Sequence, residues 1–371
     1  MVVLRSVTLA LIVVGGVVFH PSAMRVSLAD DDAIRNLRDA RAQVVSILPI
    51  GRRAARTPRT AAGRTEAPEG SGVIVRFADG TVRVVTAAHV VAGARDLRVR
   101  TADGSISPAW IVAQDRQTDI ALIATQFLER PSGFTLAPAP VEIGDRVCAI
   151  GNAFGLDLSV TCGVVSARGR AGVGFNAIED FVQTDAPVNP GASGGALVTQ
   201  DGRLVGILSA IFTKQSDANI GVNFAVSTAL TRRVVTELHM NGRYARALSG
   251  LQLGRAIGRL GTGQMAARVV RVRAGSPGAL AGLRPGDAIY GAGGDRVRKP
   301  ADFRRVMNLT PPPFTLPLKV MRGTRKLSPV LQIRATDVAQ PRAPEQVGGQ
   351  VGAQTDSAPA DPQARETPPK E

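Results

Sequence analysis

The pentapeptide Gly191-Ala192-Ser193-Gly194-Gly195 sets one serine among small residues. A serine becomes a nucleophile where a tight turn exposes its hydroxyl and aims backbone N–H groups at the developing oxyanion. Flanking glycines permit such a turn and allow a substrate backbone to approach closely. The same letters also fit the G-x-S-x-G turn of α/β-hydrolases and a plain glycine-rich hairpin loop. The fold therefore depends on which residues can serve this serine.

Histidines are the candidates for a general base, and the chain contains three. His20 lies in an apolar N-terminal stretch, and His239 ends a predicted helix, where a cation suits the helix dipole. His89 ends an apolar run that starts at Val84 and is typical of a strand. We therefore predict that His89 is the base.

An acid that could orient this histidine is Asp119, at the start of the hydrophobic run Asp119–Ile123. A carboxylate there needs a polar partner, and an imidazole ring would supply one. The chain order is then His89, Asp119, Ser193, whereas an α/β-hydrolase would place its histidine last. A buried histidine and an aspartate that merely begins a strand remain the alternatives for either residue alone. Together, the three residues favour a nucleophilic triad.

Short apolar runs alternate with turn signals from Gly70 to about Ile211, which predicts strands rather than helices. Asp79-Gly80, Asp103-Gly104 and Asp201-Gly202 each lie between such runs, as in β-hairpins. Many short strands without intervening helices indicate an all-β barrel or sandwich. The predicted strands are 44–47, 72–77, 81–86, 119–123, 147–150, 160–166, 196–198, 204–209 and 222–226, and a helix is predicted over 229–239.

The order of the three residues, with Thr86-Ala87-Ala88-His89 and Thr118-Asp119-Ile120-Ala121, resembles chymotrypsin-like serine proteases. The segments 151–156, 181–186, 189–191 and 221–225 are similar to those of the HtrA/Deg family of exported bacterial proteases. The resemblance covers about residues 42–335. It implies an all-β chymotrypsin-like double β-barrel of six strands each, with the triad in the cleft between the barrels. Ser193 would attack the peptide carbonyl, and the N–H groups of Gly191 and Ser193 would form the oxyanion hole.

The sequence departs from the family pattern at Ala192, where Asn or Asp usually precedes the serine. A polar contact that helps to fix the oxyanion loop is thereby lost, which predicts a low resting activity. Six positions before the serine stands Pro187, where trypsin-like enzymes carry an acid. The nearby Leu208, Ser209 and Ala210 are apolar or small, so we expect a pocket for a small or medium aliphatic side chain. Alternatively, these are only core residues of a strand.

The only two cysteines, Cys148 and Cys162, flank the turn 152–157 on what should be adjacent antiparallel strands. An exported protein could oxidise them, and closing a loop of this length would stabilise the fold by about 3 kcal/mol. Two buried free thiols are the alternative. Two cysteines exclude a disulfide scaffold, and three histidines exclude most multi-histidine metal sites, so neither metal nor cofactor is expected.

A second unit, 248–335, contains Gly275–Ile289, which resembles the signature of the PDZ domains attached to these proteases. The resemblance implies a small α+β fold that adds a peptide C-terminus as an extra strand. The carboxylate-binding loop should be Gly250-Leu251-Gln252-Leu253, although Gln252 stands where the family commonly has glycine. We predict a strand over 268–272, a short helix, and a second helix over 301–309.

The termini differ from these two units. Residues 1–29 contain Arg5, an apolar stretch from Val7 to Phe19 and the small residues Ser27-Leu28-Ala29, which predicts a cleaved signal peptide. An uncleaved membrane anchor is the alternative, but thirteen apolar residues are short for a membrane span. Within the predicted protease unit, 30–247, residues 51–69 form a basic exposed loop. The tail 336–371 is rich in Pro, Ala and Gln and is predicted to be disordered.

The chain of 371 residues has a formal charge of +15, which taken alone suggests a nucleic-acid or membrane binder. The excess belongs almost wholly to residues 248–335, with sixteen basic and three acidic residues, while 70–247 are nearly neutral. Nucleic acid is not expected, because this unit has few aromatic residues for stacking and export removes it from the genome. The remaining interpretations of the charge are a basic face exposed to solvent, attraction of acidic peptides, and contact with an anionic lipid surface.

These observations predict a periplasmic serine endopeptidase that hydrolyses unfolded or misfolded proteins and binds peptide C-termini at its PDZ-like domain. The alternative is a chaperone-like peptide-binding module with a dormant protease, since Ala192 and Gln252 depart from the family pattern. The family commonly forms trimers, and the sequence neither supports nor excludes a homotrimer.

Overall fold

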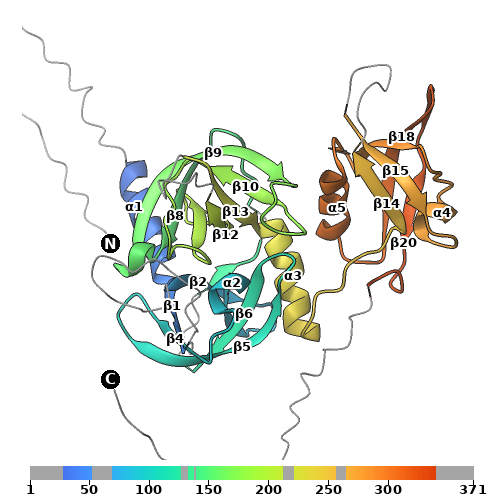
Figure 1. Ribbon diagram of the computed structural model, residues 1–371. Helices are drawn as coiled ribbons and strands as arrows, with labels where there is room; N and C mark the ends of the chain where they lie inside the picture. The colour runs from blue at the N-terminus through green and yellow to red at the C-terminus, as the bar shows by residue number, and fades with distance from the viewer. Residues whose placement is uncertain are drawn as a thin grey trace, which may run out of the picture. The chain divides into compact units, whose positions relative to one another are not determined.

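The computed structural model describes residues 28–51, 69–126, 133–137, 139–211, 221–255 and 265–339. The predicted signal peptide up to residue 27, most of the basic loop 51–69, and the tail from residue 340 lie outside these ranges. Within them, no helix is long and apolar enough to cross a membrane. Strands dominate the described chain and form two β-barrels and one smaller sheet (Figure 1).

The first barrel follows helix α1 (Leu28–Ala42) and closes because β2 returns to pair with β1. Its strands lie in the order β1-β4-β5-β6-β3-β2, and the short strand β7 (Phe134–Thr135) runs parallel to β2. Helix α2 (Ala88–Val91) follows β3. The six barrel strands are β1 (Val44–Ile50), β2 (Gly70–Arg76), β3 (Val82–Ala87), β4 (Asp96–Arg100), β5 (Ile106–Asp115) and β6 (Ile120–Thr125).

The second barrel is closed in the order β10-β13-β12-β11-β8-β9. It is followed by helix α3 (Thr228–Asn241), which begins at the capping hydroxyl of Ser227 and ends at Gly242, and which confirms the helix predicted over 229–239. A 3₁₀ turn, η1 (Ala153–Gly155), connects β8 to β9. The strands are β8 (Arg146–Gly151), β9 (Ser159–Arg170), β10 (Phe181–Thr184), β11 (Ala196–Thr199), β12 (Leu204–Ile211) and β13 (Asn223–Ser227).

The Asp-Gly dipeptides explain how the strands reverse. Gly80, Gly104 and Gly202 have φ values of 82°, 89° and 78°. They connect β2 to β3, β4 to β5, and β11 to β12. A positive φ at the second position is what tight hairpin turns require, and glycine adopts it without steric cost. The predicted hairpins are therefore confirmed.

Both faces of many strands are buried, which gives the two barrels separate cores and a shared one. Val45 and Val84 belong to the apolar core of the first barrel, and Val147 and Leu197 to that of the second. A larger cluster joins strands of both barrels, including Val85, Ile150, Phe181 and Ile207. This shared core holds the two barrels together, so residues at the ends of their strands keep a fixed separation.

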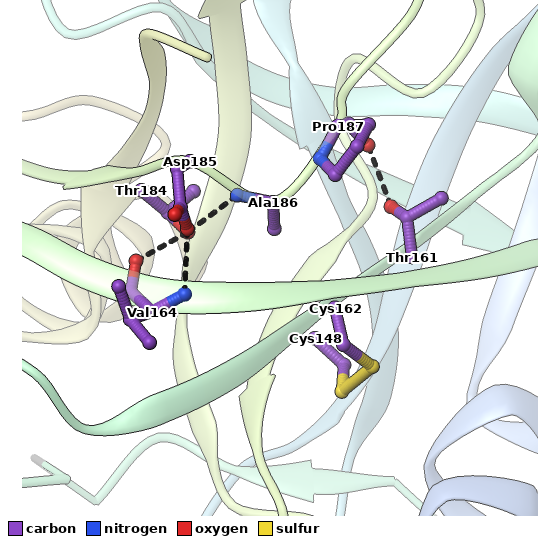
Figure 2. Close-up of a disulfide and its surroundings, with 8 residues drawn as sticks. All are labelled: Cys148, Thr161, Cys162, Val164, Thr184, Asp185, Ala186 and Pro187. Atoms are coloured by element: carbon purple, nitrogen blue, oxygen red, sulfur yellow. Dashed lines mark hydrogen bonds between the residues drawn. A yellow bond between two sulfur atoms is a disulfide. The ribbon is translucent and has the colours of Figure 1, made fainter.

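The two cysteines form a disulfide, which decides between the two alternatives that the sequence left open. Cys148 of β8 and Cys162 of β9 are direct cross-strand partners (Figure 2). Beside this bond, the Val164 N–H donates to Asp185 at 2.7 Å and the Thr161 hydroxyl donates to the Pro187 carbonyl at 2.5 Å. Strand β9 is thus bonded on one side to β8 and on the other to the segment that leads to Ser193.

The third sheet is the core of the unit predicted from residue 248. Its path is β14-β15-β16-β18-β19, with β17 beside β16 and β20 beside β18. Helices α4 (Pro277–Leu280) and α5 (Pro300–Leu309) confirm the two predicted helices. The strands are β14 (Leu251–Arg255), β15 (Ala267–Val272), β16 (Ala288–Ala292), β17 (Asp295–Arg296), β18 (Phe314–Arg322), β19 (Arg325–Leu327) and β20 (Val330–Ile333).

Three features of the chain differ from the sequence-based expectations. Residues 251–253, expected in a carboxylate-binding loop, belong to strand β14, so only Gly250 of the predicted loop lies in the turn before it. Strands β4 and β5 were not predicted, because much of β5 is exposed and its apolar residues include Trp110 and Ile111 on the surface. The tail was expected to begin at residue 336, yet Val338 forms an antiparallel bridge with Ala247 and the Leu248 N–H donates to Asp337. The compact part of the chain therefore extends to Ala339.

Candidate active site

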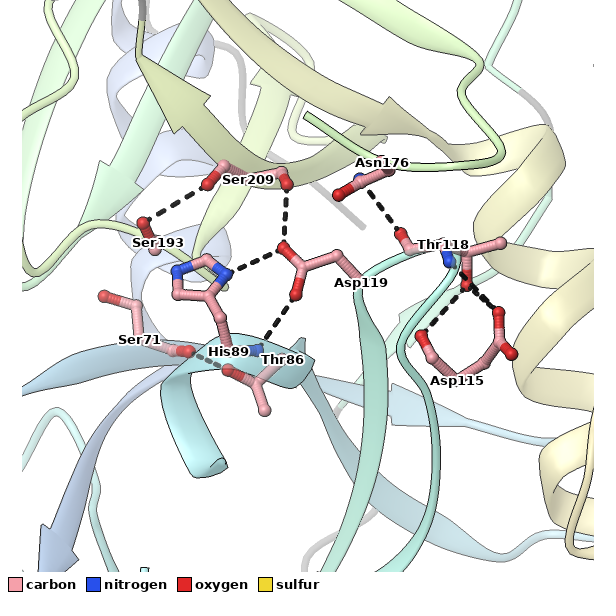
Figure 3. Close-up of polar contacts among 9 residues, drawn as sticks. All are labelled: Ser71, Thr86, His89, Asp115, Thr118, Asp119, Asn176, Ser193 and Ser209. Carbon is pink, nitrogen blue, oxygen red and sulfur yellow. Dashed lines mark hydrogen bonds and ion pairs between the residues drawn. The ribbon is translucent and has the colours of Figure 1, made fainter. Parts of the chain in front are cut away.

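His89 stands on the one-turn helix α2, directly after strand β3 (Figure 3). Its neighbours Ala88, Val90 and Val91 are buried, while about half of the His89 side chain is exposed. The helix is anchored by its apolar residues, so the imidazole projects from the barrel toward solvent and toward the second barrel. A histidine in this position can exchange a proton with a bound substrate.

Both carboxylate oxygens of Asp119 are hydrogen-bonded. One carboxylate oxygen accepts the His89 backbone N–H at 2.9 Å. The other lies 2.7 Å from His89 Nδ1 and accepts the Ser209 hydroxyl at 3.0 Å. Because a carboxylate only accepts hydrogen bonds, Nδ1 carries the ring proton and Nε2 is left with a lone pair. Asp119 has a φ of 59°, a conformation in which few non-glycine residues occur, and these bonds keep it there.

Ser193 lies on the opposite side of the imidazole from Asp119, as Figure 3 shows. Its hydroxyl donates to the backbone carbonyl of Ser209 at 3.4 Å, close to the limit for a hydrogen bond. The structure thus brings together His89 and Asp119 from the first barrel and Ser193 from the second. This is the arrangement in which a serine hydroxyl can pass its proton to an oriented imidazole.

The backbone around Ser193 offers two unused donors. The carbonyls of residues 189 to 193 all accept hydrogen bonds: from the N–H groups of Ala192, Phe154, Gly195 and Ser71 and from the Ser71 hydroxyl. By contrast, the N–H groups of Gly191 and Ser193 have no acceptor within the described residues. Two neighbouring donors without a protein partner are what an oxyanion hole needs before substrate binds.

Two glycines make this loop possible. Gly191 has a φ of 95°, and a Cβ atom there would lie 2.2 Å from the carbonyl oxygen of Asn152. Gly194 has a φ of 86°, and its Cβ atom would lie 2.1 Å from the Ser71 carbonyl oxygen. Any other residue would be strained and would also collide with backbone that cannot yield. The glycines of the pentapeptide are therefore required by the packing of the loop.

Sequence reasoning missed Ser71, Asn152 and Phe154, which hold this loop from outside. Ser71 is fully buried at the start of β2 and bonds to both Gly191 and Ser193. The Phe154 N–H donates to the Pro190 carbonyl at 2.7 Å. A serine between two glycines at the start of a strand was the available signal for Ser71, because such spacing allows close backbone approach.

A hollow of about 360 Å³ adjoins the imidazole and is lined by His89, Asp119, Ser209, Arg116, Phe175 and Asn176. The segment that carries Phe175 and Asn176 is organised by Glu179, which is 4% exposed. Its carboxylate accepts the backbone N–H groups of all four residues from 173 to 176, at 2.7 to 3.1 Å. The segment is therefore a defined wall beside the imidazole, suited to contact a peptide bound there.

The four residues predicted for the substrate pocket have different surroundings. Pro187 is exposed, and the side chain of Ala210 lies outside the described residues. Ser209 directs its hydroxyl to Asp119, so it supports the acid as well as the serine. Leu208 is fully buried in the core of the second barrel, because alternate residues of β12 face inward. For Leu208, the alternative of a core residue is the correct one.

The remaining described histidine lies away from this site. His239 Nε2 is 2.8 Å from an oxygen of Asp79, and its ring stacks on Phe77. The hydrogen bond from His239 lowers the pKa of Asp79 to about 2. Across the described ranges, no group of three or more His, Cys, Asp or Glu side chains is arranged to hold a metal ion.

A second candidate site lies on the small sheet, where β14 forms the edge. Gly250 makes the turn into this strand with a φ of 72°, and a Cβ there would lie 2.1 Å from Ser276. Leu251 and Leu253 of β14 line the same hollow as Phe303 and Met307 of α5. Gln252 points to the exposed side of the strand. An edge strand beside an apolar groove is suited to pair with an extended peptide.

Two family models match the chain: a trypsin-like peptidase domain over residues 70–207 and a PDZ domain over residues 268–322. The periplasmic serine endoprotease DegP of Salmonella typhimurium is 34% identical over 277 residues, which are 73% of this chain and 58% of that protein. A probable DegP-like endoprotease of Chlamydia trachomatis is 37% identical, over 69% of this chain and 52% of that protein. The chain thus spans little more than half the length of these curated relatives.

Solved structures match over a larger share. The HtrA-type protease AlgW with a tripeptide is 31% identical, has a TM-score of 0.63, and aligns over 84% of this chain and 98% of its own. This chain belongs to the HtrA family of serine proteases. The predicted fold class is confirmed: an all-β chymotrypsin-like double barrel followed by an α+β PDZ domain. The candidate site at Ser193 and the candidate peptide groove beside β14 thus belong to one HtrA-type chain.

Proposed function

We propose that this chain is a serine endopeptidase that hydrolyses peptide bonds of unfolded or misfolded proteins, with His89, Asp119 and Ser193 as its catalytic triad. The observation that carries the proposal is the pairing of an oriented imidazole with two unused backbone donors. His89 Nδ1 lies 2.7 Å from Asp119, and the N–H groups of Gly191 and Ser193 have no acceptor in the described chain. Orientation of the base and stabilisation of the oxyanion are the two requirements of acyl transfer to serine.

In this mechanism the Ser193 oxygen attacks the carbonyl carbon while its proton passes to His89 Nε2. The Gly191 and Ser193 N–H groups bind the resulting oxyanion. The imidazolium, held by Asp119, then gives its proton to the leaving amine, and an acyl-enzyme remains on Ser193. Water, deprotonated by His89, attacks this ester and releases the second product. Asp119 stays ionised throughout and fixes the ring tautomer.

Substrate recognition is proposed at two places. The small or medium aliphatic side chain before the scissile bond would enter a pocket near Pro187, Ser209 and Ala210. Peptide C-termini would add to β14 beside α5, with the carboxylate at the turn of Gly250, where the strand Leu251–Arg255 begins. The edge position of β14 and its apolar side chains support this second site. Accordingly, we propose a protease unit over 30–247 and a PDZ-like unit over 248–335.

The names of the relatives support a periplasmic location, because DegP of Salmonella typhimurium and DegQ of Escherichia coli are both described as periplasmic endoproteases. We propose the same location for this chain, with residues 1–29 as the export signal and a homotrimer as its assembly. The competing proposal is a peptide-binding module with a dormant protease. The loss of a polar side chain at position 192 is the observation that favours it.

A fluorophosphonate probe tests the enzyme proposal against the dormant one. Nucleophilic attack would join the Ser193 oxygen to phosphorus, release fluoride and pass the proton to His89. We expect one probe per chain, located on Ser193 by peptide mass spectrometry, with faster labelling when unfolded casein or a C-terminal peptide is added. Correctly folded protein that stays unlabelled with both additions would reject the protease and favour the dormant module. Labelling at another serine would reject the triad.

A further inference from the structure

Ser71 connects two segments of the site that are far apart in sequence. Its hydroxyl donates to the Gly191 carbonyl at 2.8 Å and accepts the Asn152 N–H at 2.8 Å. Its backbone N–H donates to the Ser193 carbonyl at 2.8 Å. The Thr86 hydroxyl in turn donates to the Ser71 carbonyl at 2.6 Å (Figure 3). One buried residue of the first barrel thus contacts both ends of the loop in the second.

These bonds bear on one of the two unused donors, the Gly191 N–H, and they do so through the neighbouring turn; the Ser193 N–H is set by the Ala192 carbonyl, which accepts the Gly195 N–H. In a planar trans peptide the C=O and the following N–H point in opposite directions, so fixing one fixes the other. The Pro190 carbonyl, which sets the Gly191 N–H, is held by Phe154, and Phe154 follows the turn that starts at Asn152. Ser71 therefore holds both this turn and the Gly191 carbonyl. Without the hydroxyl, the Gly191 carbonyl and the Asn152 N–H would both lose their bond to Ser71. Of its bonds to the first barrel within the described residues, the turn would keep only the one from the Asn152 side chain to Glu69.

The side chain at position 192 cannot supply this anchor. Ala192 is 5% exposed and packs among the apolar residues of the second barrel core. We propose that Ser71 is a positioning residue. It keeps the oxyanion loop in the conformation in which its backbone N–H groups can bind an oxyanion, in place of a polar side chain at position 192. The proposal rests on the proposed protease activity. It predicts that Ser71 acts on the rate of the chemical step rather than on substrate affinity.

The experiment compares Ser71→Ala with Thr228→Val in the full chain. Thr228 is also buried and its hydroxyl donates to a carbonyl, that of Leu204 at 2.9 Å, outside the active site. Direct loss of an oxyanion donor lowers kcat about 100- to 1,000-fold, so misplacing one should cost about 10- to 100-fold. We expect this loss for Ser71→Ala, with KM changed by less than about two-fold, and wild-type kcat for Thr228→Val.

Wild-type kcat in a folded Ser71→Ala variant would overturn the role of Ser71 and leave the protease proposal intact. An inactive, unlabelled wild type would instead overturn the protease proposal itself. If the alanine variant does not fold, Ser71→Cys keeps a similar volume with a weak donor and acceptor. An intermediate kcat for this variant supports the positioning role, and a wild-type kcat contradicts it.

A separate observation concerns the charge beside the edge strand β14. The three carboxylates of residues 248–335 are all engaged within that unit, which leaves its other basic side chains without acidic partners there. The engaged groups are Asp287 with Arg322 at 2.7 Å, Asp295 with Arg305 at 2.9 Å, and Asp302 with the N–H groups of Arg298 and Lys299.

Two of these basic residues lie on the strand next to the β14 edge. Arg268 and Arg271 are on the exposed face of β15, opposite Gly254 and Gln252 of β14. Neither has an acidic partner among the described residues. A strand added to β14 would lie about 10 Å from β15, two strand spacings, which an arginine and a glutamate together can span. Gly254 has no side chain to stand between Arg268 and the peptide.

We infer that the β14 edge selects C-terminal peptides in which apolar residues alternate with acidic ones. The apolar side chains would face Leu251, Leu253 and α5, and the acidic ones would face Arg268 and Arg271. This follows from the period of two in a strand and from charge complementarity. The inference rests on the proposed peptide-binding role of the PDZ-like unit and is independent of the catalytic triad.

Fluorescence anisotropy with labelled decapeptides tests this selection, using full-length Ser193→Ala protein to prevent cleavage. Peptides with Glu at the penultimate position and two residues before it should bind about three- to ten-fold more tightly than their Gln counterparts. The difference should vanish at about 0.5 M NaCl and in an Arg268→Gln/Arg271→Gln variant. It should persist in Arg325→Gln/Lys326→Gln, which alters the β18–β19 hairpin instead.

Equal affinity for the Glu and Gln peptides would contradict the selection. Vesicles containing phosphatidylglycerol serve as a second probe. Binding to them that needs Arg268 and Arg271, without discrimination between the peptides, would overturn the proposal in favour of a membrane surface.

Discussion

Replacing Ser193 with alanine is expected to lower kcat by about a million-fold, since loss of the nucleophile removes the whole covalent route. The expected residual rate comes from binding and from the Gly191 and Ser193 N–H groups, which an alanine leaves in place. The fold should be unaffected, because the bond of this hydroxyl within the described residues is a long one, 3.4 Å, to the Ser209 carbonyl. The measurement is kcat for an unfolded peptide substrate, together with urea unfolding of both proteins.

Ser105→Ala is the matched control, because Ser105 is exposed in the β4–β5 turn and is outside the site. It should retain the wild-type rate. A Ser193→Ala protein that keeps more than about one thousandth of kcat would show that another group performs the attack. The competing proposal of a dormant module predicts no difference at all between the two variants, since neither would alter a rate that is absent.

Much of the double barrel could be predicted from local patterns. The Asp-Gly dipeptides mark turns through a backbone requirement that is independent of the rest of the chain. Buried strands such as β3 and β12 are recognisable because most of their residues are apolar. Strand β5 was missed for the opposite reason. Its exposed side chains Trp110, Ile111 and Val112 break the alternation that a half-buried strand should show.

The candidate triad could be proposed from sequence for a different reason: few residues could fill each role. Three histidines left one credible base, and Asp119 stood alone at the start of a buried run. The Gly-Ser-Gly spacing signals close backbone approach at Ser71 but not its partners, which lie 81 and 120 positions away. No local pattern records such distances. Leu208 was also hard to place from sequence, because a β-bulge between Leu208 and residue 210 interrupts the alternation of β12.

The disulfide could be predicted from the sequence only in part. Spacing alone left Cys148 and Cys162 either bonded or free, because a strand register cannot be read from two residues. The observed pairing of β8 with β9 places them directly opposite each other. The 14-residue separation gives about 3 kcal/mol of stabilisation in the chain-entropy model. A covalent bond in the second barrel thus supports the strand that contacts Asp185 and Pro187.

Asp119→Asn is expected to lower kcat by about 10,000-fold while the protein stays folded. Asp119 accepts three hydrogen bonds: from the His89 backbone, from the His89 ring and from Ser209. An amide has one acceptor oxygen and one NH₂ donor, so it cannot accept at both positions. If the NH₂ faces the ring, it donates to Nδ1 and drives the ring proton to Nε2. His89 could then no longer accept the proton of Ser193.

The measurement is kcat and KM of Asp119→Asn with the same peptide substrate, beside Asp201→Asn. Asp201 is a half-exposed carboxylate in the β11–β12 turn, bonded to Arg203 at 2.6 Å, and its amide should leave kcat unchanged. A tautomer effect lowers kcat and leaves KM near its wild-type value, because substrate binding does not involve the carboxylate. If instead KM rose while kcat held, Asp119 would serve substrate binding, and the assignment of His89 as an oriented base would fail with it.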